Sequence, residues 1–187
     1  MNYPEPAIAD VPKAANPLLQ HAIDTYASET NKVVYVWNQF SDADLDYRPH
    51  ARSMTVRETM RHQILSERRF FAEFLGSPEP AAAAALPSED TVAASVARAA
   101  ELARPRLTYL ASQPDSWWLE NVPFFDAQRE RAWIFWRRVL HTAHHRTQLS
   151  VSLRLLDKPV VPTYGPTADV TWEGATPTLT VSRVTGI

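Results

Sequence analysis

The sequence contains no cysteine, and this absence removes several kinds of chemistry at once. Without cysteine the chain has no disulfide, no thiolate ligand for a metal ion and no cysteine nucleophile. Glycine is also scarce, with 4 residues in a chain of 187, and neither the GxGxxG nor the GxxxxGK[ST] pattern occurs. A glycine-rich phosphate-binding loop is therefore disfavoured.

Charge of one sign and long apolar runs are missing as well. The net charge is −2, which gives no reason to expect binding to nucleic-acid phosphates or to an anionic membrane. No window approaches 18 apolar residues, so we expect no membrane span. Residues 1–20 hold several prolines and Asp10, with no basic region before an apolar run, so we expect no signal peptide and a cytoplasmic protein.

Apolar residues at helical spacing predict four long helices. We place them at about residues 17–40, 55–75, 88–111 and 130–156. Thr55 with Glu58 three residues later is a capping-box pattern that opens the second helix. Pro105 should kink or interrupt the third. A chain of this length suits one domain, and the fold class we predict is all-α, an antiparallel four-helix bundle.

The flanking and connecting segments have less regular patterns. We expect residues 1–16 to form a loose lead-in, 17–169 the bundle and 170–187 a tail packing on it, irregular or with a short β-hairpin. The runs that would pair in this hairpin are Asp169–Trp172 and Thr178–Val184. Residues 113–129 should be a loop with some extended pairing. The approach to any site is expected to be shaped either by the tail or by the aromatic side chains of this loop: Trp117, Trp118, Phe124 and Phe125.

Histidines in the last predicted helix are the strongest chemical signal. His141 and His145 lie one turn apart and about 40° off a common line, so both imidazoles can point at one ion, whereas His144 points away. A third ligand must come from elsewhere in the chain. His62 is the preferred candidate because it lies inside the second helix, and His21 and His50 are alternatives.

Three neutral imidazoles suit Zn²⁺ and also Ni²⁺, Fe²⁺ or Cu²⁺, and they leave coordination positions open, as in catalytic sites. The alternative is that these histidines lie on the surface or are hydrogen bonded, without any metal. Three polar residues are candidates for a catalytic role. Gln148 falls about 20° from the line of His141, Glu58 lies one turn before His62, and Tyr164 is a potential hydrogen-bond donor.

The order and spacing of these residues resemble the DinB/YfiT superfamily of bacterial four-helix bundles. The motifs are Met60-Arg-His62-Gln-Ile and His141-Thr-Ala-His-His145-Arg146-Thr-Gln148, within a resemblance that covers roughly residues 17–169. It implies a divalent metal ion such as Zn, Ni or Fe held by His62, His141 and His145, and commonly a homodimer. Characterised relatives use low-molecular-weight thiols such as bacillithiol or mycothiol, as S-transferases or isomerases.

Three functions are consistent with this resemblance. The first is a metal-dependent transferase or isomerase that acts on a small molecule with an external thiol, in which Gln148, Arg146 or Tyr164 contacts the substrate. The second is a metal-dependent hydrolase, for which Glu58 is the one general base that we can place. The third is a metal-binding protein without turnover. Metal-dependent reaction of an electrophile with an added thiol would separate the first function from the others.

Overall fold

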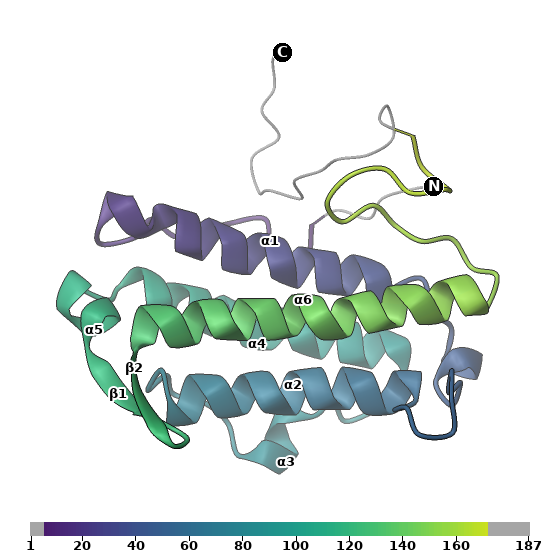
Figure 1. Cartoon of the computed structure of the whole chain (residues 1–187), viewed down its shortest axis with the longest axis horizontal. Helices are drawn as coiled ribbons and strands as arrows, with labels where there is room; N and C mark the ends of the chain where they lie inside the picture. Colours follow the sequence, from purple (N-terminus) through teal and green to yellow (C-terminus); the bar gives the residue numbers. More distant parts are fainter. Residues whose placement is uncertain (1–5, 172–187) are drawn as a thin grey trace.

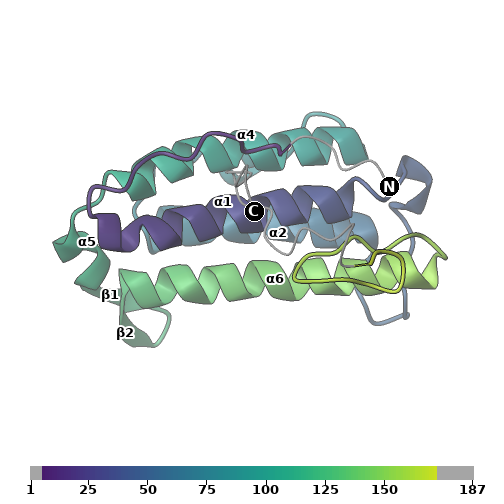
Figure 2. The same cartoon turned by 90° about the horizontal axis from the view of Figure 1, so that it is seen from above.

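The computed structural model describes residues 6–171 and confirms the all-α bundle. Four long helices lie side by side (Figures 1 and 2): α1 (Gln20–Trp37), α2 (Val56–Glu73), α4 (Val92–Ala111) and α6 (Arg131–Leu155). Short 3₁₀ turns precede α1 (η1, Pro17–Leu19) and follow it (η2, Asp42–Asp44). Within residues 6–171, none of the helices is both long and apolar enough to cross a membrane.

Contacts at one end of the bundle show in which direction each of the four long helices runs. Ala15, shortly before α1, donates its backbone N–H to the carbonyl of Ala111 at the end of α4 (2.7 Å). Phe74 at the end of α2 packs on Phe124, shortly before α6, with ring centroids 4.8 Å apart. The start of α1 and α6 and the end of α2 and α4 therefore share this end. Consequently α1 and α6 run in one direction, antiparallel to α2 and α4.

The connection between α2 and α4 must cross the whole length of the bundle. It spans residues 74–91 and contains one helical turn, α3 (Ala82–Ala85). Eighteen residues reach up to about 60 Å when extended, and an 18-residue helix is about 27 Å long, so the crossing is easy. Gly76, with φ of 69°, occupies the left-handed region just after α2 and allows the chain to turn there.

Helix starts follow their capping residues. Thr55 is the N-cap of α2, and the predicted capping box with Glu58 is present: the Glu58 N–H donates to the Thr55 hydroxyl (3.0 Å), and the Thr55 N–H donates to the Glu58 carboxylate (2.8 Å). Helix α4 begins later than predicted. Its N-cap is Thr91, whose hydroxyl accepts from the N–H of Ala94 (3.1 Å), so Ser88 lies outside the helix.

Pro105 was expected to kink or interrupt α4, and it does not interrupt it. The helix is continuous from Val92 to Ala111 with the proline inside it. Proline removes one i→i−4 hydrogen bond, here the bond to Glu101, and its ring crowds that carbonyl. The helix tolerates this cost because apolar side chains before and after Pro105 are buried in the core, among them Leu102, Leu107 and Leu110.

Residues 113–129 form more structure than the predicted loop. They contain a short helix, α5 (Asp115–Leu119), and a hairpin of β1 (Asn121–Phe124) and β2 (Ala127–Glu130), in which Phe124 pairs with Ala127. The expected extended pairing is therefore confirmed near this position. The hairpin predicted for the C-terminal tail lies outside the described residues, apart from its first positions.

The described part of the lead-in, residues 6–16, is packed against the bundle. Ile8 is buried, and the Asn31 side chain of α1 holds its backbone at both ends: the Ile8 N–H donates to Asn31 Oδ1 (2.8 Å), and Asn31 Nδ2 donates to the Ile8 carbonyl (3.0 Å). The Asn31 amide thus satisfies both backbone polar groups of the buried Ile8, and Ile8 in turn satisfies the Asn31 side chain.

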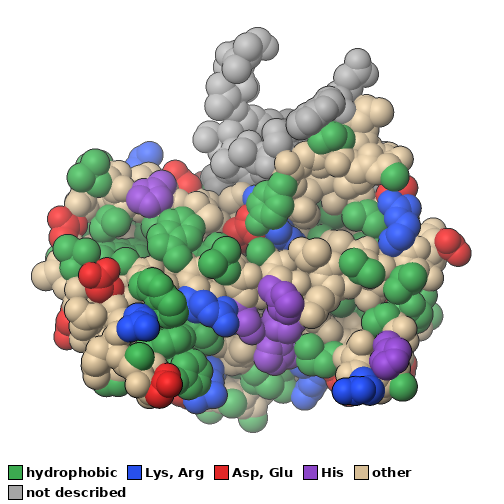
Figure 3. Space-filling view, viewed as in Figure 1, with side chains coloured by type: hydrophobic (Ala, Val, Ile, Leu, Met, Phe, Trp, Pro, Cys, Tyr) green, Lys and Arg blue, Asp and Glu red, His purple; other side chains and the backbone are tan. Residues whose placement is uncertain are grey.

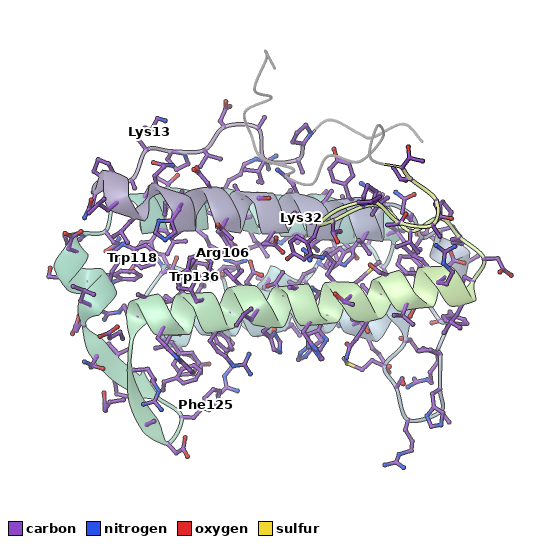
Figure 4. All side chains as sticks on the ribbon, turned by 45° about the horizontal axis from the view of Figure 1, so that its top comes forward. Lys13, Lys32, Arg106, Trp118, Phe125 and Trp136 are labelled. Carbon is purple, nitrogen blue, oxygen red and sulfur yellow. The ribbon has the colours of Figure 1, made fainter. Side chains whose placement is uncertain are left out.

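One carboxylate, that of Glu67 on α2, binds side chains from the other three long helices. It accepts hydrogen bonds from the Tyr26 hydroxyl of α1 (2.5 Å), Arg106 of α4 (2.9 Å) and Arg138 of α6 (3.0 Å). Burial raises the pKa of Glu67, but the two guanidinium groups outweigh that effect and hold the pKa below its usual value. Figure 4 shows Arg106 among the side chains between the helices.

We predict that Pro105→Ala stabilises the protein, because alanine restores the missing helix hydrogen bond without the ring clash. The free energy of unfolding, measured by urea denaturation, should rise by roughly 1–3 kcal/mol. Thr108→Ala, also on the exposed side of α4, is the control and should change it by at most about 0.7 kcal/mol. Destabilisation by Pro105→Ala would show that α4 needs the proline geometry for its packing.

Candidate metal centre

Three histidines from two helices converge on one point. His62 comes from α2, and His141 and His145 come from successive turns of α6. One ring nitrogen of each lies within 4.8 Å of the others, and the Nε2 atoms of His141 and His145 are 3.3 Å apart. The His62 ring centroid is 4.5 Å from that of His145 and 5.5 Å from that of His141. The structure thus brings together the three residues predicted from the sequence.

The donor set and its spacing fit a divalent ion. Two nitrogens bound to a tetrahedral Zn²⁺ at about 2.0–2.1 Å are separated by about 3.3–3.4 Å, which matches the distance between His141 and His145. The third nitrogen is within 4.8 Å and needs a small movement to complete the site. Histidines gather at the centre of the face in Figure 3, where α6 lies above α2 in Figure 1. One side of the cluster therefore faces solvent and is open to a ligand.

The three imidazoles are neutral at physiological pH. Burial lowers the pKa of His141 to about 3, with further help from the positive charge of Arg138 and from His145 and His62. Burial likewise lowers the pKa of His62, with a contribution from Arg138. Burial also lowers the pKa of His145, although its hydrogen bond to Gln148 opposes the effect. Only neutral imidazole has a lone pair to bind a metal ion, so the lowered pKa values meet one requirement for coordination.

Gln148 orients His145. Its Oε1 lies 2.8 Å from Nδ1 of His145 and accepts the proton there, which leaves Nε2 of His145 free to face the other two histidines. The amide nitrogen of Gln148 also lies 3.0 Å from Nε2 of His144, so the exposed His144 is linked to the cluster through Gln148. Gln148, a candidate catalytic residue from the sequence, is therefore a neighbour of the cluster.

Arg138 is the contact that sequence reasoning missed. Its guanidinium is buried (1% exposed), and Nη1 lies 2.9 Å from Nδ1 of His141 and 2.6 Å from the Ser66 hydroxyl. Its Nη2 is held by Glu67. The signal in the sequence was its position three residues before His141, which puts both on one face of a helix.

The fold and the family are supported by comparison with known proteins. The DinB family model matches residues 15–174 of the chain. The chain belongs to the DinB family. A DinB-like protein of Bacillus cereus has a similar crystal structure, with a TM-score of 0.68 at 15% identity, covering 78% of this chain and 97% of that one.

A second crystal structure, of a DinB-like protein from Bacillus subtilis, has a TM-score of 0.61 at 18% identity and covers 77% of this chain and 96% of that one. At these identities the likeness concerns the fold of this DinB-family chain. A search of curated proteins found no match.

Other residues considered from the sequence lie elsewhere in the DinB-family fold. The Glu58 carboxylate bonds to the backbone of Thr55 and to Arg48 (3.1 Å), so it caps α2. The Tyr164 hydroxyl donates to Glu29 (2.8 Å) on α1. Arg146 also pairs with Glu29, on the side of α6 away from His62.

The two alternative histidines have other partners. His21 stacks on Trp136 with centroids 5.9 Å apart, and His50 accepts from the backbone N–H of Arg52 (3.2 Å). Neither belongs to the three-histidine cluster.

Only some of the aromatic residues that were expected to shape the approach lie near the histidine cluster. Phe70 of α2 stacks on His141 with centroids 6.2 Å apart, and Phe124 of the hairpin packs on Phe70 (5.7 Å). Phe125, at the hairpin turn in Figure 4, is 63% exposed. Trp118, by contrast, is buried in the core against Phe135 of α6 (5.4 Å), so it supports the helix instead of the approach.

We predict that acid destabilises the metal-free protein before its carboxylates titrate. Below about pH 6.5 the histidines of the unfolded chain bind protons, whereas the lowered pKa values of His62, His141 and His145 mean that the folded state takes up these protons only at lower pH. The unfolded state then binds more protons, so stability falls as pH falls. For His141 this loss continues towards about pH 3.

Urea unfolding with chelator present, between pH 6.5 and 5, measures how steeply the free energy of unfolding changes with pH. His141→Gln should make this slope shallower, and measurements between pH 7.5 and 8 should show little slope from these groups. An unchanged slope in His141→Gln would contradict the assigned cause.

Proposed function

We propose that this DinB-family chain is a metal-dependent enzyme in which His62, His141 and His145 hold a divalent ion, and that it transfers or isomerises a small molecule with the help of an external thiol. The observation that carries the proposal is the convergence of three neutral imidazole nitrogens within 4.8 Å at the surface. A bound divalent ion with open positions lowers the pKa of a coordinated thiol or water.

The chain's own residues have separate tasks in this proposal. Gln148 holds the proton of His145 on Nδ1, so that Nε2 is presented to the site. Phe70 packs on His141 and shields one side of it from water, which strengthens electrostatic interactions there. His144 is exposed in the single chain and is linked to the cluster through Gln148. The absence of cysteine is consistent with a thiol that comes from outside.

The hydrolase alternative is less well supported. It requires a general base close to a water molecule at the site. Glu58 was the candidate, and its carboxylate is already engaged by Thr55 and Arg48. Hydrogen bonding to the backbone of Thr55 lowers the pKa of Glu58, with help from Arg48, which makes it a weaker base. A non-catalytic metal-binding role remains the third candidate.

We predict that untagged protein, purified without added metal or chelator, contains close to one divalent ion per chain by mass spectrometry. His62→Ala, His141→Ala and His145→Ala should each abolish this content, because two imidazoles bind an ion far more weakly than three. His144→Ala should leave it nearly unchanged, and His50→Ala is the matched histidine control. Equal loss in all five variants would contradict the assignment of ligands.

Activity is tested on the same metal-loaded protein. With bacillithiol or mycothiol and 1-chloro-2,4-dinitrobenzene, a thiol transferase forms the sulfur–carbon bond and releases chloride. The rate should depend on metal and fall at least 100-fold in His141→Ala. Hydrolysis of 4-nitrophenyl acetate without thiol, at a metal-dependent rate, would favour the hydrolase, and metal binding without either reaction would favour a binding protein.

We also propose that the chain forms a homodimer. Several large apolar side chains of α6 face solvent: Trp133, Trp136, Leu140, Val151 and Leu155. Trp133 with Leu155 and Trp136 with Val151 are nearly symmetric about residue 144, so two antiparallel copies of α6 would pair these apolar side chains, as a two-fold interface requires. Leu140 would lie opposite Gln148, close to the two-fold axis.

Light scattering after gel filtration measures this association. Leu140 is 66% exposed and Leu119 of α5 is 62% exposed. Leu140→Asp should shift the protein towards monomer, whereas Leu119→Asp should not. A wild-type monomer at micromolar concentration would contradict the proposed dimer.

A further inference from the structure

The hydrogen-bond partners of His141 and His145 determine which ring nitrogen carries the proton. A guanidinium only donates, so Nδ1 of His141, 2.9 Å from Arg138 Nη1, must accept. The proton of neutral His141 is therefore on Nε2, which lies 3.3 Å from Nε2 of His145. His145 donates from Nδ1 to Gln148, so its Nε2 is the acceptor for His141. With these proton positions, every hydrogen bond in the series Arg138–His141–His145–Gln148 has one donor and one acceptor.

His141 and His145 thus carry their ring protons on different nitrogens. His145 has the arrangement that metal-binding histidines usually have, with Nδ1–H bonded to a carbonyl oxygen and the Nε2 lone pair free. His141 has the reverse arrangement, because the nitrogen that faces the cluster carries the proton. While Arg138 occupies its present position, His141 has no lone pair to offer at the site.

We propose that Arg138 is a positioning residue that keeps His141 from coordinating metal until its guanidinium moves away from Nδ1. This inference rests on the proposed three-histidine site. Coordination through Nε2 requires the ring proton to pass from Nε2 to Nδ1 by exchange with water, and the ring keeps one proton throughout. A protonated Nδ1 cannot face a guanidinium donor at 2.9 Å, so Arg138 must withdraw.

The surroundings of Arg138 allow this movement inside the bundle. Its guanidinium keeps Glu67 (3.0 Å) and Ser66 (2.6 Å) as partners without His141. Its Nε is buried and has no hydrogen-bond partner in the described structure. Arg138, Glu67 and Gln63 also line an internal cavity of about 30 Å³, large enough for one or two water molecules. The side chain therefore has both space and partners on its inner side.

The consequence is a weaker, more exchangeable metal ion than three free imidazoles would give. Filling the site requires displacing Arg138 from His141, and a buried positive charge close to the ion opposes it electrostatically. Occupancy of the site is also coupled to the Glu67 carboxylate, to which Arg106 and Tyr26 bind. Metal binding would thus alter contacts at the centre of the bundle.

Zn²⁺ affinity, measured by competition with a chromophoric chelator, tests the inference. Arg138→Gln removes the obligatory donor and offers an amide oxygen to Nδ1–H, so the dissociation constant should fall by about 10-fold or more. Arg138→Lys keeps a cationic donor and should remain close to wild type. Arg106→Lys is the matched control, because it keeps a cation beside Glu67 and Glu79 and does not touch His141, and it should leave the dissociation constant close to wild type.

Nitrogen-15 chemical shifts of the histidine rings test the wild-type protein directly and do not depend on the folding of a variant. Without metal, Nδ1 of His141 should be unprotonated and Nδ1 of His145 protonated. With Zn²⁺, both Nδ1 atoms should be protonated. A protonated Nδ1 of His141 in the metal-free protein would overturn the inference, as would an unchanged or weaker affinity in folded Arg138→Gln. Loss of metal in His62→Ala would still support the three-histidine site in that case.

Discussion

The buried contact between Glu67 and Arg138 is the interaction on which the histidine cluster depends. It joins α2 to α6 at the level where His62 faces His141, and Arg138 bonds to His141 itself. A buried charge must be paired, so the two helices can pack only where the carboxylate meets the guanidinium. Removing Glu67 would leave Arg138 buried without a carboxylate, at a cost of roughly 3–5 kcal/mol, whereas Glu67 keeps Arg106 as a partner when Arg138 is removed. Because Tyr26 and Arg106 bind the same carboxylate, this constraint extends to α1 and α4.

Helix α6 separates two polar environments on its two sides. His145 points to α2 and the open cluster, whereas its neighbour Arg146 points to α1 and pairs with Glu29. Glu29 also pairs with the buried Lys32 and accepts a hydrogen bond from the exposed Tyr164. Successive residues on a helix differ by about 100°, so adjacent positions serve different neighbours. One helix can therefore hold a reactive, solvent-facing site and also a structural ion pair. The rigidity of the bundle then positions the site without a loop.

The local features of the fold could be predicted from the sequence because they depend on residues a few positions apart. The capping box of Thr55 and Glu58 is an example, and so is the shared face of His141 and His145. The role of Glu58 was less predictable. Glu58 does lie one turn before His62 in α2, but its carboxylate is bound to the backbone of Thr55 and to Arg48. Of the two outcomes expected at Pro105, a kink or an interruption, the interruption does not occur, since core packing on both sides of it outweighs the local cost.

The sequence by itself determined the four helices, the two histidines of α6 and the absence of thiolate chemistry, since each follows from composition or from spacing along one helix. Tertiary structure decided which other residues meet those histidines. His62 is 79 positions from His141 in the chain, and only the packing of α2 on α6 brings their rings together. The same packing places Glu67 beside Arg138, and so decides which nitrogen of His141 faces a donor. Spacing along one helix cannot specify such a contact, because it depends on how two helices are set against each other.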